Sequence, residues 1–299
     1  MIKLSLVIAT YNRAEQLMIT LRSVAAQTAD KTIWECIVVD NNSTDHTHSN
    51  IDNFANANSH LNIRYCLEVN QGLSHARNAG IANAKGEIIA FIDDDEHIVP
   101  DFIDAYIELF DKYPTAMSAG GKIIAEYPSG RPEWMSKYAE EPIANPMDFG
   151  EEIKPFPKGR IPGGGNMAMR KEVFETIGNF DITLGRTGKK LSGGEESDLF
   201  ERMNAKGMKC YYVPKAVMYH IIPESKLNRD YFVRLSYNNG IGQWTRATLH
   251  SKRISLIIRE ICKWGATFLL CITHRPVQSK YLILMRWNIS KGIINAARS

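Results

Sequence analysis

Short apolar segments alternate with stretches of helical periodicity over the first third of the chain. Runs rich in β-branched residues predict strands at 3–9, 34–39, 63–67 and 87–92. Leu17, Leu21 and Val24 recur at helical spacing after the first of these strands, and a helix is predicted at 73–84. Strands that alternate with helices favour parallel pairing, so we expect an α/β fold with a mostly parallel, Rossmann-like central sheet flanked by helices.

Polar residues follow three of these predicted strands. Thr10-Tyr11-Asn12 follows the first strand, Asp40-Asn41-Asn42 the second and Asp93-Asp94-Asp95 the fourth. In an open α/β sheet, ligands bind beyond the carboxyl ends of the strands. The three segments are therefore expected to meet at one edge and to form a binding site.

The pattern changes after residue 125. Residues 126–166 contain seven of the 12 prolines, which predicts only short regular elements and a loop that serves as a lid or binding loop. Helices are predicted again at 171–177 and 196–205, and short strands at 208–213 and 216–219. We expect one domain over 1–225, with halves at 1–115 and 116–225, and a helical extension over 226–299.

The C-terminal extension is basic. From residue 251 onward there are nine Lys or Arg and one acid, Glu260, a net +8 that leaves −5 for the rest of a chain whose total is +3. Residues 254–272 and 281–294 predict two basic amphipathic helices with tryptophan anchors, and the uncharged run at 264–273 is shorter than the roughly 20 residues that span a bilayer. We expect residues 251–299 to contact an anionic membrane; the alternatives are a helical cap on the larger domain and a dimer interface.

The cysteines and the charges bear on the cellular location of the protein and on whether it binds nucleic acid. The five cysteines are odd in number and include no C-x-x-C pair, which favours reduced residues in a cytoplasmic protein over zinc ligands or disulfides. The N-terminal apolar run is too short for a signal peptide. With the basic helices, this predicts a cytoplasmic protein at the inner face of the plasma membrane. A nucleic-acid partner explains the basic extension but not the acidic strand end, so none is expected.

The acidic run Asp93-Asp94-Asp95-Glu96 indicates a metal site. Adjacent carboxylates repel one another and raise each other's pKa, and a divalent cation removes that cost. Oxygen ligands suit Mg²⁺ or Mn²⁺, which also bind substrate phosphates. The alternative is an acidic helix start, since a helix is expected to begin near Asp101.

Several motifs in a fixed order resemble one enzyme family. Ser5–Arg13, Val38–Asp45, Asn70–Gly72 with Ala76–Asn78, and Asp93–Asp95 resemble the donor-binding half of family 2 glycosyltransferases, which are inverting enzymes with the GT-A fold. Gly163–Asn166, Gly194–Leu199 and Val217–His220 resemble the acceptor side of that family. The resemblance covers about residues 3–225, with the nucleotide-binding half at 1–115 and the acceptor half at 116–225.

The resemblance implies roles for the matching positions. Asp95 would be the metal ligand that meets the diphosphate, and Asp93 and His220 would complete the shell of Mn²⁺ or Mg²⁺. The expected donor-binding residues are Thr10, Tyr11, Asn12, Arg13, Asp40, Asn41, Asn70, Arg77, Asp93 and Asp94. The expected acceptor contacts are Gly164, Gly165 and Asn166, because glycine lets a sugar approach the backbone closely. Trp134 is a further candidate that would stack on a sugar ring, although large aromatic residues more often lie in the core.

The general base is expected in the Glu195-Glu196 pair. This pair matches a Glu-Asp pair of the family whose second member is the base, which favours Glu196, with Glu195 and Asp198 as further candidates. An inverting transfer needs one carboxylate to take the proton of the acceptor hydroxyl. The alternative is a helix start with acids in its first turn.

The expected activity is transfer of one sugar from a nucleoside-diphosphate sugar to a hydroxyl of a glycan or lipid-linked acceptor in cell-surface polysaccharide synthesis. Gln243-Trp244-Thr245-Arg246 does not reproduce the Gln-x-x-Arg-Trp motif of processive synthases, which favours a single transfer. A sugar nucleotidylyltransferase is an alternative, but it needs a Gly-rich basic loop where this chain has Thr10–Arg13. A sugar-nucleotide or glycan binding protein without catalysis is the other alternative, and the intact acidic residues argue against it.

Overall fold

The computed structural model describes residues 1–187 and 193–298, which form two compact units. The first unit contains Met1–Ile124, Met147–Ile182 and Glu196–Ile221. The second contains Ala125–Pro146 and the described parts of Thr183–Glu195 and Ile222–Ser299. The last segment of the second unit begins at Ile222, near the expected boundary at residue 225. The unit also contains two segments from earlier in the chain.

The first unit is built on a central sheet whose N-terminal half is parallel. Strands β1 (Leu4–Thr10), β2 (Trp34–Asp40), β3 (Ile63–Leu67) and β4 (Ile88–Asp93) pair in the order β3-β2-β1-β4. Helices α1 (Ala14–Ala25), α2 (Thr47–Ala57) and α3 (Leu73–Asn83) connect them. The predicted strands and their parallel pairing are confirmed.

The remaining strands extend the sheet with antiparallel pairs. The order continues β4-β8-β6-β9-β5, and β8 (Met167–Arg170) pairs antiparallel with both β4 and β6 (Ala116–Glu126). Strand β9 (Lys209–Ile221) also pairs antiparallel with β5 (Glu96–Ile98) and β7 (Lys154–Pro155). The expected strands at 208–213 and 216–219 are thus one strand, and the sheet is parallel only in its first half.

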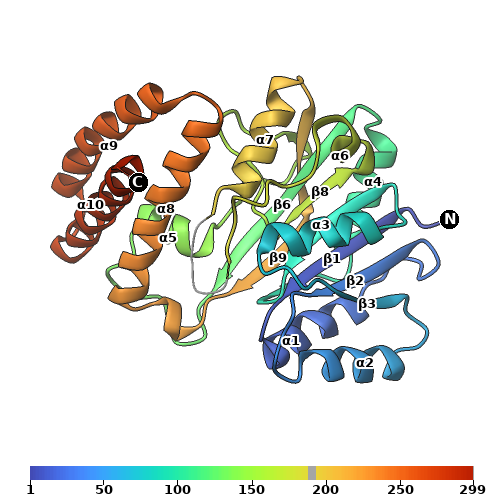
Figure 1. Cartoon of the computed structure of the whole chain (residues 1–299). Coiled ribbons are helices and arrows are strands. Elements are labelled where there is room, and N and C mark those ends of the chain that lie inside the picture. Colours follow the sequence, from blue (N-terminus) through green and yellow to red (C-terminus); the bar gives the residue numbers. More distant parts are fainter. Residues whose placement is uncertain (188–192, 299) are drawn as a thin grey trace. The chain divides into compact units, whose positions relative to one another are not determined.

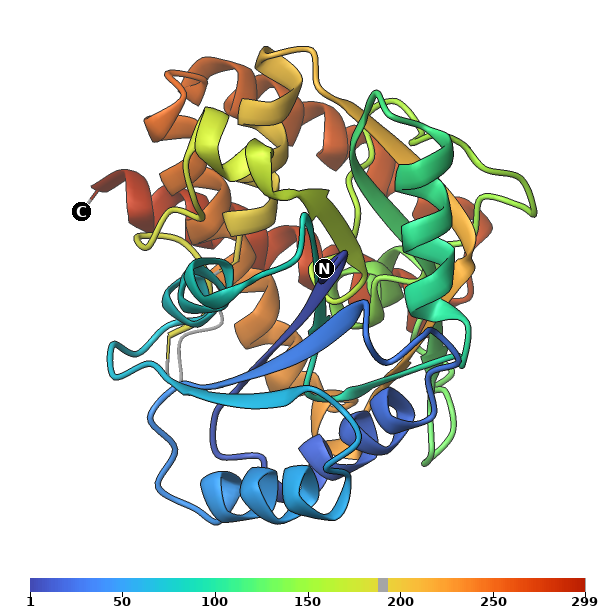
Figure 2. The same ribbon diagram turned by 90° about the vertical axis from the view of Figure 1, so that its right-hand side faces the viewer.

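Apolar side chains cover both faces of this sheet. Leu4, Leu6 and Ile8 of β1 pack on one face, whereas Val7 packs on the other, as the alternation of side chains along a strand requires. Helices α1 and α4 (Phe102–Lys112) join the first cluster; α3, α6 (Lys171–Ile177) and α7 (Glu195–Ala205) join the second. Figures 1 and 2 show α1 and α2 on one side of the parallel strands and α3 on the other. The sheet is thus the middle layer between two layers of helices.

The second unit is helical. Its helices are α5 (Lys137–Ala144), η1 (Glu224–Lys226), α8 (Arg229–Leu249), α9 (Arg253–Thr273) and α10 (Pro276–Arg298). Helices α8 and α10 approach each other closely at Gly240. A β carbon there would lie 2.1 Å from the carbonyl oxygen of Ile289. Among the described residues, no helix combines the length and the apolarity needed to cross a bilayer.

Two of the residues expected to face a membrane make contacts within this unit instead. Arg286 of α10 is buried and pairs with Glu260 of α9 at 3.0 Å. The indole nitrogen of Trp264 donates to Ser290 across the same two helices. The predicted place of Arg286 on a membrane face is therefore wrong, whereas Trp287, Ile283 and Ile294 of α10 are exposed.

Candidate active site

Strand register brings the polar strand ends together at one edge of the first unit. Thr10 lies opposite Asp40, and Ala9 lies opposite Asp93 in the neighbouring parallel pair. Parallel strands that end at the same level present their next residues side by side. The predicted meeting of the segments after β1, β2 and β4 is confirmed.

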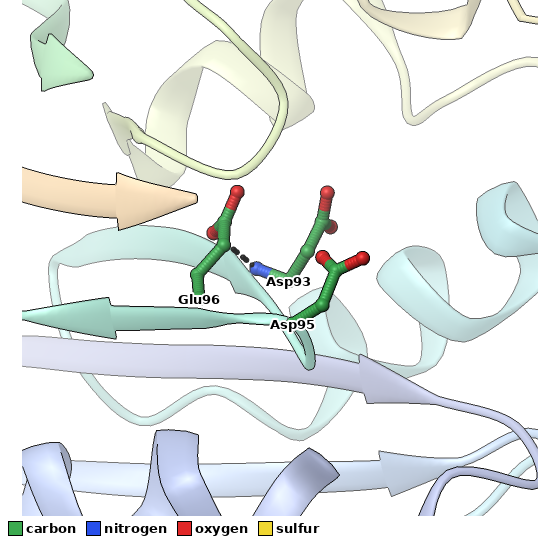
Figure 3. Close-up of side chains that lie close together, drawn as sticks. All are labelled: Asp93, Asp95 and Glu96. Carbon is green, nitrogen blue, oxygen red and sulfur yellow. Dashed lines mark hydrogen bonds between the residues drawn. The ribbon is translucent and has the colours of Figure 1, made fainter. Parts of the chain in front are cut away.

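Three carboxylates converge directly after β4. One oxygen from each of Asp93, Asp95 and Glu96 lies within 4.8 Å of the others, as Figure 3 shows. Glu96 is buried, and its Oε2 accepts the backbone N–H of Asp93 at 2.7 Å, which orients it toward the turn. Three hard oxygen donors in this arrangement fit a divalent cation such as Mg²⁺ or Mn²⁺.

Glu96 belongs to the acidic run that predicted a metal site, but it was not among the ligands expected from the sequence. Its position in an acidic run before a helix allowed the interpretation of a cap, but α4 begins only at Phe102. The chain instead turns after Asp95 and enters the short strand β5, where Glu96 lies opposite His220 of β9. His220 was expected as a metal ligand, and its Nε2 lies 3.8 Å from Oδ1 of Asp95.

Burial makes this acidic cluster electrostatically costly. Burial raises the pKa of Asp94 to about 6 even though the guanidinium of Arg13 lies 2.8 Å from its carboxylate. Burial, with Asp93 and Asp95 nearby, also holds the pKa of Glu96 well above its usual range. Clustered buried carboxylates are stabilised by added positive charge, so this environment favours a bound cation.

Thr10 and Arg13 contact the acidic turn. Thr10 donates from its hydroxyl to Asp94 at 2.8 Å, and Nη1 of Arg13 donates to both Asp94 and Asp95. Both residues were expected to bind the donor. Their side chains instead position the carboxylates in this structure, so their direct contact with a nucleotide stays a prediction.

A buried arginine links the acidic cluster to the expected base. Arg77 of α3 donates to Glu196 at 2.9 Å and to Asp93 at 3.2 Å, and its own side chain is 2% exposed. The side chain of Glu196 is 21% exposed, so its carboxylate remains reachable. The general-base candidate and a predicted metal ligand therefore share one guanidinium.

The two glycines expected to contact the acceptor make room for these same side chains. A β carbon at Gly164 would lie 2.0 Å from Oε1 of Glu196, and one at Gly165 would lie 2.0 Å from Oε1 of Glu96. Glycine is required there because a protein carboxylate, and not only a sugar, approaches the backbone. The reason given for these glycines from the sequence was therefore incomplete.

Two other expected site residues have structural roles. The side chain of Asn166 is fully buried, accepts from Tyr106 and donates to the carbonyls of Lys122 and Ala216, so its predicted role as an acceptor contact is wrong. Asp198 is buried and binds Arg202 one helical turn later at 2.8 Å, which argues against it as the base. In each case internal hydrogen bonds occupy the polar group that was expected to meet a substrate.

Two expected site residues remain, Glu195 as a candidate base and Trp134 as a candidate sugar contact. Glu195 is buried at the start of α7, whereas Glu196 is only half-buried, which favours Glu196 as the base. Trp134 lies in the second unit, where its ring stacks on Tyr281 at a centroid distance of 4.3 Å and packs against Phe232. Its indole belongs to that unit's aromatic core, and a contact between Trp134 and a sugar stays a prediction.

Loops after β1, β2 and β3 form the expected nucleoside side of the edge. Asn41 is a correction here, because its amide donates to the carbonyls of Glu68 and Asn70 and accepts from Gly72. Both of its N–H donors are thereby used to hold the loop at 68–72, and none is left for a nucleobase. Asn70 is exposed on that loop.

The turn after β1 is held in a similar way. Asn12 adopts a left-handed conformation, φ 51°, and accepts the N–H of Thr44 at 2.7 Å, while Tyr11 is exposed. Asp40 is buried and accepts from Ser43 and from the hydroxyl of Tyr65. Hydrogen bonds between the loops thus set the shape of the surface on which a nucleoside would lie.

Comparisons with known proteins agree on one family. The family model described as glycosyl transferase family 2 matches residues 5–178. The chain is 27% identical over 242 residues to the glucosyl-dolichyl phosphate glucuronosyltransferase of Haloferax volcanii, covering 80% of this chain and 75% of that relative. It is also 27% identical over 242 residues to the succinoglycan biosynthesis protein ExoM of Rhizobium meliloti, with 78% and 71% coverage.

Solved structures share the fold at low sequence identity. The mannosyltransferase PcManGT from Pyrobaculum calidifontis, in complex with GDP-Man and Mn²⁺, matches with a TM-score of 0.59 and 18% identity over 99% of this chain and 73% of that chain. S. aureus TarS matches with a TM-score of 0.56 and 20% identity; the match covers 80% of this chain but only 39% of TarS. At these identities the likeness shows the fold alone, which is GT-A.

Proposed function

The chain belongs to glycosyl transferase family 2, and we propose that it is a metal-dependent, inverting enzyme that moves one sugar from a nucleoside-diphosphate sugar to a hydroxyl of a glycan or lipid-linked acceptor. The observation that carries the proposal is the position of Arg77 between Glu196 and Asp93. It holds a candidate base beside a candidate donor site, which is the juxtaposition that a direct displacement needs. Relatives named for succinoglycan biosynthesis and for a dolichyl phosphate sugar support a role in cell-surface polysaccharide or glycolipid synthesis.

The donor would bind at the carboxyl ends of β1, β2 and β4. Asp93, Asp95 and Glu96 would hold Mn²⁺ or Mg²⁺, with His220, whose Nε2 lies 3.8 Å from Asp95, as a further candidate ligand. When bound, such a cation neutralises charge on a departing diphosphate as a Lewis acid. Arg13 and Thr10 keep the acidic turn in place through their bonds to Asp94.

Glu196 would act as the general base. Its carboxylate would take the proton of the acceptor hydroxyl while that oxygen attacks the anomeric carbon. The bond from that carbon to the diphosphate breaks on the opposite face, its electron pair leaves with the diphosphate, and the configuration inverts. Gly164 leaves the carboxylate free to lie against the backbone, and Arg77 fixes its direction.

A donor screen tests the proposal. The wild-type chain is incubated with UDP-, dTDP- and GDP-sugars and Mn²⁺, and release of the nucleoside diphosphate is measured. We expect one class of donor to be hydrolysed slowly, with release abolished by Asp95→Ala and reduced at least about 100-fold by Glu196→Gln. Glu175→Gln, an exposed position on α6, is the matched control for the second change.

Calorimetry separates the enzyme from a binding protein. A donor that binds in the presence of Mn²⁺ but is neither hydrolysed nor transferred to any glycan or lipid-linked acceptor would favour the binding protein over the enzyme. If no donor binds or reacts, the proposed function is wrong. If Glu196→Gln transfers at the wild-type rate, the base lies elsewhere. The reduced state of the five cysteines and the cytoplasmic location both stay predictions.

A further inference from the structure

Helix α9 exposes an apolar face. The exposed fractions of its large apolar residues run from 48% at Ile257 to 81% at Ile272, and the residues fall in two groups, at 254–261 and 268–272, that are about two helical turns apart. Residues at this spacing lie on one side of an α-helix. We call the following residues the outer face: Ile254, Ile257, Ile258, Ile261, Phe268, Leu269 and Ile272.

The opposite side of α9 is anchored in the second unit. Leu256, Glu260 and Thr267 are buried there, and Glu260 pairs with Arg286 of α10. Ser290 of the same helix donates to Glu260 and accepts from Trp264. These polar contacts have fixed partners, so they set the rotation of α9 about its axis. The outer face consequently cannot turn inward without breaking a buried ion pair, which is costly.

The charges around the outer face have one sign. Lys252 and Arg253 are exposed at the start of α9, and Arg259 is exposed along its flank. Glu260 is the one acidic residue of the chain after residue 250, and it is buried against Arg286. Lys263 lies on the anchored side of α9, where burial and the neighbouring Arg286 lower its pKa. An apolar face with a purely cationic border matches an anionic lipid surface.

The size of the outer face argues against a second copy as its main occupant. A helix of 21 residues is about 31 Å long, and a strip about 10 Å wide along it would cover roughly 300 Å² on each partner. Stable dimers bury about 800 Å² on each partner. The helix also lacks the length and apolarity to cross a bilayer. It therefore fits a position in the plane of the membrane surface.

We propose that the outer face of α9 docks the protein on an anionic membrane, with its Ile, Leu and Phe side chains at the boundary of the acyl chains and Lys252, Arg253 and Arg259 at the lipid phosphates. The inference goes beyond the proposed transfer reaction and does not depend on it.

Vesicle sedimentation of the full chain tests the docking. We use vesicles of phosphatidylcholine with phosphatidylglycerol, and vesicles of phosphatidylcholine alone, at low and high salt. The wild type should sediment with the anionic vesicles and be released by salt. Ile261→Glu with Phe268→Glu should lose binding at least tenfold, whereas Ile19→Glu with Leu67→Glu, which adds the same charge at exposed apolar positions of the first unit, should bind like the wild type. Arg253→Gln with Arg259→Gln should weaken binding by about 25-fold, at roughly fivefold for each cation.

Three outcomes would overturn the docking proposal. The wild type could stay in the supernatant with anionic vesicles, or the Ile261→Glu, Phe268→Glu variant could bind as the control does. Size-exclusion chromatography could also show a wild-type dimer that this variant splits, in which case a second copy covers the outer face. Circular dichroism and thermal unfolding confirm that each variant is folded. Because binding is read without a donor, failure here is distinct from failure of the proposed reaction.

Discussion

Gly164 lies so close to Glu196 that the carboxylate occupies the space of a β carbon, with Oε1 only 2.0 Å from where that carbon would be. The same β carbon would lie 2.6 Å from Nη2 of Arg77. A single glycine thus accommodates both members of the ion pair that joins α3 to α7. The position of the proposed base depends on the absence of a side chain on a loop more than 30 residues earlier in the chain.

Gly164→Ala should therefore displace Glu196 and lower kcat. A shift of about 1 Å in a catalytic group can cost about 100-fold in rate, and we expect a loss of this order with a folded protein. Gly265→Ala is the control, since a β carbon there meets no atom within 4 Å. Steady-state kinetics with the donor found in the screen measures the effect. A wild-type kcat for Gly164→Ala would show that the close approach is unimportant for the reaction.

Arg77→Met should reduce both stability and activity. The change leaves Glu196 and Asp93 without the buried cation that they share. Removing one partner of a fully buried pair costs 3–5 kcal/mol, and since these carboxylates are partly exposed we expect about 2 kcal/mol from urea unfolding. Lys3→Met is the control, because Lys3 and Asp111 form an ion pair that is exposed on both sides. If Arg77→Met and Lys3→Met lose the same stability and activity, Arg77 has no special role in the site.

The parallel half of the sheet was predictable from the sequence for a physical reason. Strands buried on both faces appear as apolar runs, and β1, β2 and β4 are such runs, interrupted only by Ser5 and Glu35, that end at a polar residue. In the antiparallel half only β9 was predicted, as two shorter strands, and β5, β6, β7 and β8 were not. Strand β6 contains Gly121, where a β carbon would lie 1.9 Å from the carbonyl oxygen of Ala216, so close strand packing required a residue with low strand propensity.

The site was predictable in its location but not in the role of each residue. A motif identifies polar residues at a strand end, yet it does not show whether the polar group turns toward a ligand or toward the protein. Asn41, Asn166 and Asp198 all bind internal partners. Glu96 shows the reverse case, since its side chain joins the acidic cluster only because the three-residue strand β5 pairs with β9.

Asn166→Ala should act on stability and leave acceptor binding unchanged. The substitution removes hydrogen bonds at a fully buried position, including those to the carbonyls of Lys122 and Ala216, and should cost about 2–3 kcal/mol in urea unfolding. Asn295→Ala, at an exposed asparagine of α10, should stay within about 0.5 kcal/mol of the wild type. A raised KM for the acceptor without a loss of stability would restore Asn166 as a substrate contact.

Glu140→Gln should reveal a pH-dependent contribution to the stability of the second unit. Burial on its own raises the pKa of Glu140, but hydrogen bonds from Arg131 and Tyr127 outweigh it and lower the pKa below its usual 4.5. A lowered folded-state pKa adds stability above the unfolded value, and this is lost as the pH falls through the folded value. We expect the wild type to exceed the variant by about 1 kcal/mol at neutral pH, with the difference shrinking below pH 4.5 in urea unfolding. Glu133→Gln, an exposed position, should show no such trend.

Glu96→Gln should weaken the affinity for Mn²⁺. The neutral amide keeps the size of the side chain and can still accept from the N–H of Asp93, but it removes one of three carboxylates that converge on the turn after β4. Fewer charged oxygen ligands bind a hard cation less tightly, and we expect the dissociation constant from calorimetry to rise at least about tenfold. Asp101→Asn, an exposed acid at the start of α4, is the control for charge alone. Equal affinity in both variants would mean that Asp93 and Asp95 bind the cation without Glu96, which would return Glu96 to a purely structural role.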